Sequence, residues 1–215
     1  MALDSNIDGW VSEIKKYAPQ ADVVFINDLI GRYVDSYENQ NVRGTFYGER
    51  GERWYSWISF RNSSYILSSI ARKLGEFDDL NREFFIDNSY EYRIATSNLY
   101  KDYLDSFNSA RRKKIMMIGN SFNDISRDLD IRACRTVFED ELKMDGFADV
   151  LRNEANNKGI FAFIIDGSLP KSIISELINT DINYAIIDPF GSYYGEKTYN
   201  GFINKNASVF LQALR

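Results

Sequence analysis

Four carboxylates and one amide follow the apolar runs in the second half of the chain. Each lies just after a run of strand length: Asn120 after the first, Glu139 and Glu141 after the second, Asp166 after the third and Asp188 after the fourth. Ligands of an open parallel sheet bind where its strands end. Oxygen atoms of this kind suit a hard cation, and converging acids can also act as general acid and base. The same residue types cap helices, so a purely structural role stays open.

The residue types that are missing restrict the chemistry further. The 215 residues include no histidine and one cysteine, Cys134. Ser-His-Asp catalysis, Cys-His catalysis and imidazole-based zinc sites within this chain are therefore excluded. Cys134 lies in an apolar stretch and is expected to pack as a small hydrophobic residue. Neither Gly119-Asn120-Ser121 nor Asp166-Gly167-Ser168 has the further glycines of a nucleotide-binding motif. We expect no enzymatic activity and no bound cofactor, apart from a weakly held divalent cation such as manganese or zinc.

Composition narrows the class of protein. Hydrophobic residues make up 44% of the chain and charged residues 27%, which is typical of a soluble protein, and the net charge is −5. This balance disfavours nucleic-acid binding. The basic run Arg111–Lys114 is the exception, and it fits the end of a helix, where the macrodipole favours cations. No stretch is long and apolar enough to span a membrane. Residues 1–5 lack a signal-peptide pattern.

The first half of the chain is predicted to be mainly helical. A short amphipathic helix covers 10–18 and ends at Pro19, and 23–26 has the composition of a strand. A glycine-bearing loop follows over 36–53. The next predicted helix has Asn62 or Ser63 as its N-cap and is broken by Gly75 and the residues 76–79 that follow it. A long helix then extends over 80–111, roughly 48 Å at about 1.5 Å per residue. Its apolar stripe consists of Leu80, Phe84, Tyr92, Ala95, Leu99, Tyr103 and Phe107. Aromatic residues in this stripe disfavour a coiled coil.

After Lys114 the pattern alternates between strands and helices. The predicted strands are 115–118, 135–138, 160–165 and 185–187, and the predicted helices are 121–129, 145–157, 170–179 and 204–214, the last capped by Asn204. Uninterrupted apolar strands separated by helices are typical of a parallel sheet covered on both faces. The sequence therefore predicts an α/β fold with a four-stranded parallel C-terminal sheet flanked by helices.

Several strings, in their order, resemble the metal-binding solute-binding proteins of zinc and manganese ABC transporters. Residues 21–27 (ADVVFIN) are similar to that family's "ADLVVYNG" strand, and residues 54–59 (WYSWIS) to its "PHxWLSP" string. Residues 62–111 resemble its helix pair, including the long helix that links the two lobes. Residues 187–191 (IDPFG) are similar to its "LDPLG" string. The resemblance covers most of residues 10–215 and rests on the order of the strings.

This resemblance implies two α/β lobes joined by a long helix, with a metal ion between them. It divides the chain into a partial N-terminal lobe (1–59), a helix pair with the long linking helix (60–112) and a C-terminal α/β lobe (113–215). Strands and a histidine loop that begin the family's first lobe have no match here, which implies an incomplete N-terminal lobe. The family also implies an extracytoplasmic location, in the periplasm or at the cell surface, often as a lipoprotein. A membrane permease is the implied partner.

The sequence departs from the family at the metal ligands. The histidine of the "PHxW" string corresponds to Tyr55, and that of the "HxAF" string falls at about Gly119 or Asn120. The loop acid corresponds to Glu139 or Glu141, and the late aspartate to Asp188, which is retained. A neutral phenol is a poor zinc ligand, and one or two carboxylates do not complete a tetrahedral site. We expect the family's tight zinc site to be lost, leaving at most a degenerate site at Asp188 and Glu141.

Three functional hypotheses follow. The first is a divergent solute-binding-like protein whose crevice takes an unidentified small ligand, with Tyr55, Asn120, Glu139, Glu141, Asp166 and Asp188 as candidate ligand-binding residues. The second is an adhesin or interaction scaffold that presents the loops 36–53 and 192–202 to a host or surface protein. The third, ranked last, is an enzyme that uses carboxylates with Mg²⁺ or Mn²⁺.

Overall fold

The computed structural model describes residues 10–25, 57–108, 110, 113–119, 121–131, 133–191 and 195–215. These residues separate into two compact units. The first contains residues up to Trp57 together with Arg61–Ile94, and the second contains Ile58–Phe60 together with Ala95–Arg215. The predicted division at residues 59 and 112 stays a prediction. Tyr55, Asn120 and the loop 36–53 lie outside the described residues.

The second unit is built on a four-stranded parallel sheet, as predicted. Its strands are β1 (Ile115–Ile118), β2 (Ala133–Val137), β3 (Ala162–Asp166) and β4 (Asn183–Ile187). Their order in the sheet is β2-β1-β3-β4, and every neighbouring pair is parallel. The two central strands are buried along their whole length, which explains why their sequences are continuously apolar rather than alternating.

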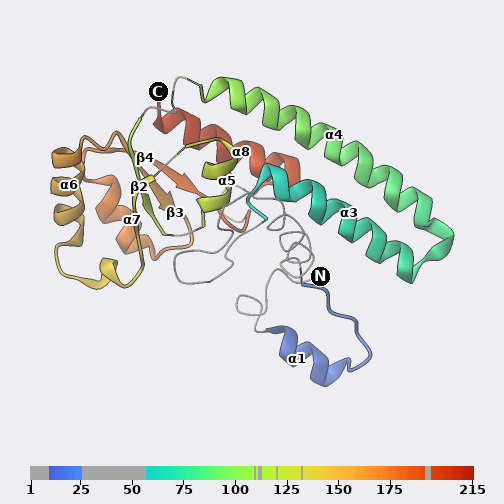
Figure 1. The fold of residues 1–215 in the computed structure, drawn as a ribbon. Helices are drawn as coiled ribbons and strands as arrows, with labels where there is room; N and C mark the ends of the chain where they lie inside the picture. The colour runs from blue at the N-terminus through green and yellow to red at the C-terminus, as the bar shows by residue number, and fades with distance from the viewer. Residues whose placement is uncertain are drawn as a thin grey trace, which may run out of the picture. The chain divides into compact units, whose positions relative to one another are not determined.

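The helices of this unit cover both faces of the sheet (Figure 1). Their bounds are α5 (Asn123–Asp128), α6 (Phe147–Lys158), α7 (Lys171–Ile178) and α8 (Tyr199–Ala213). The chain moves from β1 to β2 in one direction and from β2 back to β3 in the other. Because such crossovers are right-handed, α6 and α7 pack on the face opposite α5. The point where the direction reverses lies between β1 and β3, and this is where open α/β sheets bind ligands.

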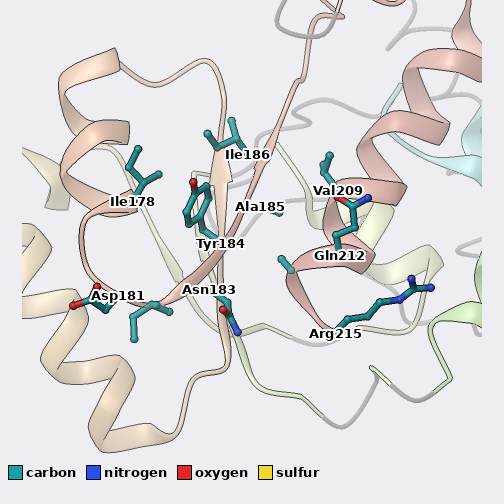
Figure 2. Close-up of a pocket in the computed structure, with 11 residues that line it drawn as sticks. Ile178, Asp181, Asn183, Tyr184, Ala185, Ile186, Val209, Gln212 and Arg215 are labelled. Carbon is teal, nitrogen blue, oxygen red and sulfur yellow. The ribbon is translucent and has the colours of Figure 1, made fainter.

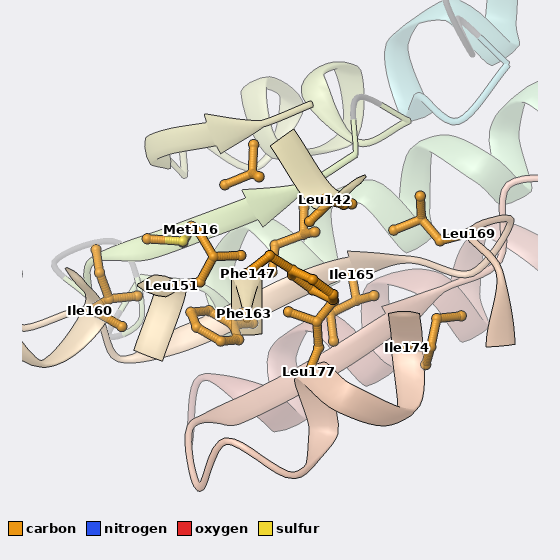
Figure 3. Close-up of a cluster of buried hydrophobic side chains, with 13 residues drawn as sticks. Met116, Leu142, Phe147, Leu151, Ile160, Phe163, Ile165, Leu169, Ile174 and Leu177 are labelled. Atoms are coloured by element: carbon orange, nitrogen blue, oxygen red, sulfur yellow. The ribbon is translucent and has the colours of Figure 1, made fainter. Parts of the chain in front are cut away.

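The core on the α6–α7 side joins strand and helix side chains (Figure 3). It consists of Met116, Ile118, Val137, Leu142, Phe147, Leu151, Ala155, Ile160, Phe163, Ile165, Leu169, Ile174 and Leu177. On the other face, α8 packs along β4, and the Phe107 ring meets the Phe210 ring edge-on at 5.4 Å. Burial on both faces fixes the strands, since a one-residue slip would reverse every side chain.

Two helices form an antiparallel hairpin before the sheet. They are α3 (Phe60–Phe77) and α4 (Arg82–Ser106), joined by a 3-10 turn, η1 (Asp79–Asn81). The helix α3 ends at Phe77, within the predicted break over 75–79, although Gly75 itself lies inside the helix. A Cβ on Gly75 would lie 2.9 Å from the Arg82 Cγ, so this glycine allows the two helices to approach closely. The Asp78 side chain caps η1 by accepting a hydrogen bond from the Asn81 amide at 3.3 Å.

The long helix α4 is shorter than predicted and only partly buried. Its 25 residues give about 37 Å at about 1.5 Å per residue. It ends at Ser106 rather than Arg111, because the chain turns there to bury the Phe107 ring completely. The predicted apolar stripe is buried only at its C-terminal end. Leu80 is 98% exposed and Phe84 63% exposed.

The remaining differences concern short segments. The first helix, α1 (Trp10–Tyr17), ends before Pro19 as predicted. The predicted strand 23–26 appears only as a single bridge residue at Phe25, and Ile26 lies outside the described residues. The last helix, α8, begins at Tyr199, and its cap is Thr198, whose side chain accepts a hydrogen bond from the Gly201 amide at 3.0 Å. The predicted cap Asn204 therefore lies inside the helix.

Candidate ligand site at the carboxyl edge of the sheet

The ends of β1 and β3 meet tightly at the reversal point of the sheet. Gly119 follows β1 with a φ of +93°, and a Cβ there would lie only 2.5 Å from the Asp166 Cβ. A Cβ on Gly167 would lie 2.6 Å from the Ile187 carbonyl oxygen. Both positions therefore require glycine. The sequence alone does not show why glycine is needed at these two positions, because the reason is the close packing of neighbouring strands.

Asp166 closes its own turn at the end of β3. Its Oδ1 accepts hydrogen bonds from the Ser168 amide at 2.9 Å and from the Ser168 hydroxyl at 2.6 Å. Burial raises the pKa of Asp166, while the two hydrogen bonds that it accepts from Ser168 oppose that rise. The Ser121 hydroxyl is buried and has no hydrogen-bond partner in the described structure. The result is a desolvated carboxyl group beside an unsatisfied hydroxyl, both at the reversal point.

Asp188 forms a similar turn at the end of β4. Its Oδ1 accepts a hydrogen bond from the Phe190 amide at 3.1 Å. The fully buried Asn206 of α8 fixes the Asp188 backbone from the other side. The Asp188 amide donates to Asn206 Oδ1 at 2.8 Å, and the Asn206 side-chain amide donates to the Asp188 carbonyl at 2.9 Å. Asn206 was not singled out from the sequence, because it is 18 residues from its partner.

Glu141 is held at the opposite edge of the sheet. Its carboxylate pairs with the Arg135 guanidinium and accepts a hydrogen bond from the Phe138 amide at 3.1 Å. Arg135 also pairs with Glu154 of α6. These contacts tie the end of β2 to α6. Glu139 is exposed beside this group.

The candidate residues divide into two groups. Asp166 and Asp188 end adjacent strands, whereas Glu141 follows β2 and Asp188 follows β4, which are opposite edge strands. Three strand spacings of about 4.8 Å separate those edges by roughly 14 Å, so the structure does not bring Glu141 and Asp188 together. Within the described ranges, no group of three or more histidine, cysteine, aspartate or glutamate side chains could hold a metal ion.

A second cluster of acidic side chains, not identified from the sequence, lies on α5. Asp124 forms an ion pair with Arg127. Burial raises the pKa of Asp124 to about 6, the Arg127 charge lowers it and the Asp128 charge raises it. Asp128 accepts a hydrogen bond from the Ser59 hydroxyl at 2.7 Å. The Tyr100 hydroxyl donates to the Asp128 carbonyl at 2.8 Å. The i, i+4 spacing of the two acids on one helix face was the signal available in the sequence.

An open groove lies beside β4, away from the candidate residues (Figure 2). Its volume is about 720 Å³. Figure 2 shows α7 on one side of β4 and α8 on the other. The groove is lined by Ile178, Asp181, Ile182, Asn183, Tyr184, Ala185, Ile186, Val209, Gln212, Ala213 and Arg215. None of the predicted site residues belongs to this lining.

The similarity to known proteins lies in structure and not in sequence. No protein-family profile and no curated protein matches the chain. Among solved structures, one is Lmb of Streptococcus agalactiae, described as a bifunctional protein with adhesin and metal transporting activity (TM-score 0.62, 14% identity, 75% of this chain and 64% of Lmb). Another is a Zn(II)-bound variant of AdcAII of Streptococcus pneumoniae. Its TM-score is 0.62 at 15% identity, and the match covers 75% of this chain and 62% of AdcAII. A third is the solute-binding protein FpvC of Pseudomonas aeruginosa with Ni²⁺. Its TM-score is 0.58 at 17% identity, and the match covers 74% of this chain and 62% of FpvC.

These comparisons establish the fold. At 14–17% identity, the likeness concerns the arrangement of helices and strands. The neighbours belong to the class of metal-binding proteins that the short sequence strings of this chain resemble. The chain spans less than two thirds of the length of these structures, between 62% and 64%. The predicted fold class is confirmed, as an α/β structure with a four-stranded parallel sheet, a long helix and part of a lobe relative to these neighbours. None of the described helices has the length and hydropathy needed to cross a bilayer.

Proposed function

We propose that this protein is a divergent solute-binding-like protein, built on the scaffold of the metal-binding ABC-transporter binding proteins, in which the family metal site is lost. The proposal rests on a scaffold that is similar to metal-bound proteins in a sequence without the usual metal-binding residue. The scaffold resembles zinc- and nickel-bound proteins, yet the sequence has no histidine. Asp166 and Asp188, which end adjacent strands, each form a turn with an amide two residues further on.

Zinc titration tests the loss of the metal site. Isothermal titration calorimetry at neutral pH should show no submicromolar zinc binding, since a tight site needs at least three protein ligands of the right type. The same experiment should be run with manganese. Submicromolar binding of either ion that disappears in Asp188→Ala would overturn the proposal.

The ligand of the crevice would be a small polar solute. The groups that remain there are hydroxyls, amides and buried carboxyls, which suit hydrogen bonds better than a bare cation. We place Tyr55, Asn120, Asp166 and Asp188 around it. Native mass spectrometry of freshly purified protein should show a bound mass that Asn120→Ala removes. Gln212→Ala in the β4 groove is the matched control, and loss of the bound mass in that variant instead would locate the ligand in the groove.

An interaction scaffold or adhesin is the second candidate function. The observation in its favour is the exposed apolar surface of the α3–α4 hairpin, where Phe77 is 56% exposed in addition to Leu80 and Phe84. Contiguous exposed aromatic and aliphatic side chains mark contact surfaces. A surface-protein partner would make Leu80→Ser lose binding without loss of stability. Under either function, we propose an extracytoplasmic location and no enzymatic activity. For the solute-binding function, we propose an ABC permease as the partner.

A further inference from the structure

The segment Ile58–Phe60 is a crossing point of the chain. It belongs to the second compact unit, whereas the residues on both sides of it belong to the first. All three side chains are buried. The Phe60 ring stacks on the Tyr100 ring at 5.4 Å. Specific contacts must hold this segment in the second unit, because the residues that flank it in the chain belong to the first.

Two hydrogen bonds hold its central residue, Ser59. The Ser59 hydroxyl donates to Asp128 Oδ2 at 2.7 Å, and the Tyr199 hydroxyl donates to the Ser59 carbonyl at 3.0 Å. The first of these is charge-assisted when Asp128 is ionised, and such bonds are roughly twice as strong as neutral ones. Asp124 lies one helical turn before Asp128. An ionised Asp124 therefore opposes the charge that strengthens the bond to Ser59.

We propose that Asp124 and Asp128 form a pH-responsive latch on Ile58–Phe60, in which a neutral Asp124 lets Asp128 carry its charge unopposed and hold the Ser59 hydroxyl more tightly. The latch acts on the crossing segment and is independent of any bound solute. It therefore regulates the scaffold rather than the proposed ligand site.

The groups facing Asp124 favour a change in mildly acidic conditions. Among the described residues, the charges that act on it are Arg127 and Asp128, both on α5. The other elements at this cluster contribute the neutral hydroxyls of Ser59 and Tyr100. Burial raises the pKa of Asp124 to about 6. Asp124 therefore becomes neutral as the pH falls through about 6, and the latch tightens in that range.

Amide hydrogen exchange on the full chain tests the latch. Protection of the 58–60 amides, normalised for intrinsic exchange and referred to the same amides in Ser59→Ala, should rise roughly fivefold between about pH 7.5 and about pH 5, as expected for relief of one partly buried like-charge contact. In Asp124→Asn, protection should equal the acid value of the wild type at both pH values. In Ser59→Ala, it should be low at both.

Controls separate the latch from general stabilisation. Asp145→Asn, at an exposed site, should keep the wild-type pH response. If Asp124→Asn does not fold, the ratio of protection between wild type and Ser59→Ala must still increase in acid. An equal pH response of the 58–60 amides in wild type and Ser59→Ala would overturn the proposal.

Discussion

Replacing Gly119 by alanine tests how tightly the reversal point of the sheet is packed. Two penalties add up. At a φ of +93°, a residue with a Cβ is strained by about 1–2 kcal/mol. The new Cβ would also lie 2.5 Å from the Asp166 Cβ, 3.0 Å from its Oδ2 and 3.2 Å from its Cγ. Overpacking of this kind costs about 1–3 kcal/mol. We therefore expect Gly119→Ala to lower the free energy of unfolding by about 2–5 kcal/mol.

Gly146 provides the matched control. Its φ is +70°, and a Cβ there would meet nothing within 4 Å. Gly146→Ala should therefore lower the free energy of unfolding only by the cost of backbone strain, about 1–2 kcal/mol. Urea unfolding followed by circular dichroism gives both values, provided that the slope with denaturant is unchanged. Equal losses at the two glycines would refute the reasoning, because they would mean that Asp166 moves aside at no cost. In that case the packing between the ends of β1 and β3 is deformable.

Three further perturbations probe the other parts of the structure. Asp124 has a folded-state pKa of about 6 against an ordinary value of 3.8, so the folded chain binds a proton that the unfolded chain has released. The free energy of unfolding should therefore fall as the pH rises through 6, by about 3 kcal/mol in total. Asp124→Asn should remove that decrease in urea unfolding at several pH values, whereas an unchanged pH profile contradicts the assignment. Asn206→Ala removes the two buried hydrogen bonds to the Asp188 backbone and should destabilise by about 2–4 kcal/mol. Gln212→Ala on the same helix should change the melting temperature little, and similar shifts for both would discount the Asn206 bonds. Leu80→Ser should alter stability by less than about 0.5 kcal/mol, and a larger loss of stability would show that Leu80 is needed for folding.

The strands were predictable because their signal is local. Uninterrupted apolar runs such as Ile115–Ile118 identify buried parallel strands without knowledge of their partners. The ends of helices were harder. The helix α3 ends within the predicted break over 75–79, but Gly75 itself stays helical, because close contact with Arg82 makes glycine favourable there. Arg111 was expected to end α4, but burial of the Phe107 ring against α8 ends it earlier. In both cases a contact between distant elements outweighed a local propensity.

The candidate site shows the same limit. Sequence reasoning identified Glu141, Asp166 and Asp188 as acids that end strands. It did not identify Ser121, because an unsatisfied buried hydroxyl has no sequence pattern. It also did not identify Asn206, whose amide pairs with a backbone on another element. Such contacts depend on which elements become neighbours, and a single sequence does not reveal that.

The sequence by itself determined the alternation of strands and helices, the absence of imidazole chemistry and the acids after each strand, because these depend on residue type and local spacing. Only the tertiary structure decided the strand order β2-β1-β3-β4. That order separates Glu141 from Asp188 and joins Asp166 to Gly119, and the packing of the helices brings Ser59 to Asp128. The physical reason is that strand order results from burying all the helices and strands together, and no short stretch of the chain encodes it.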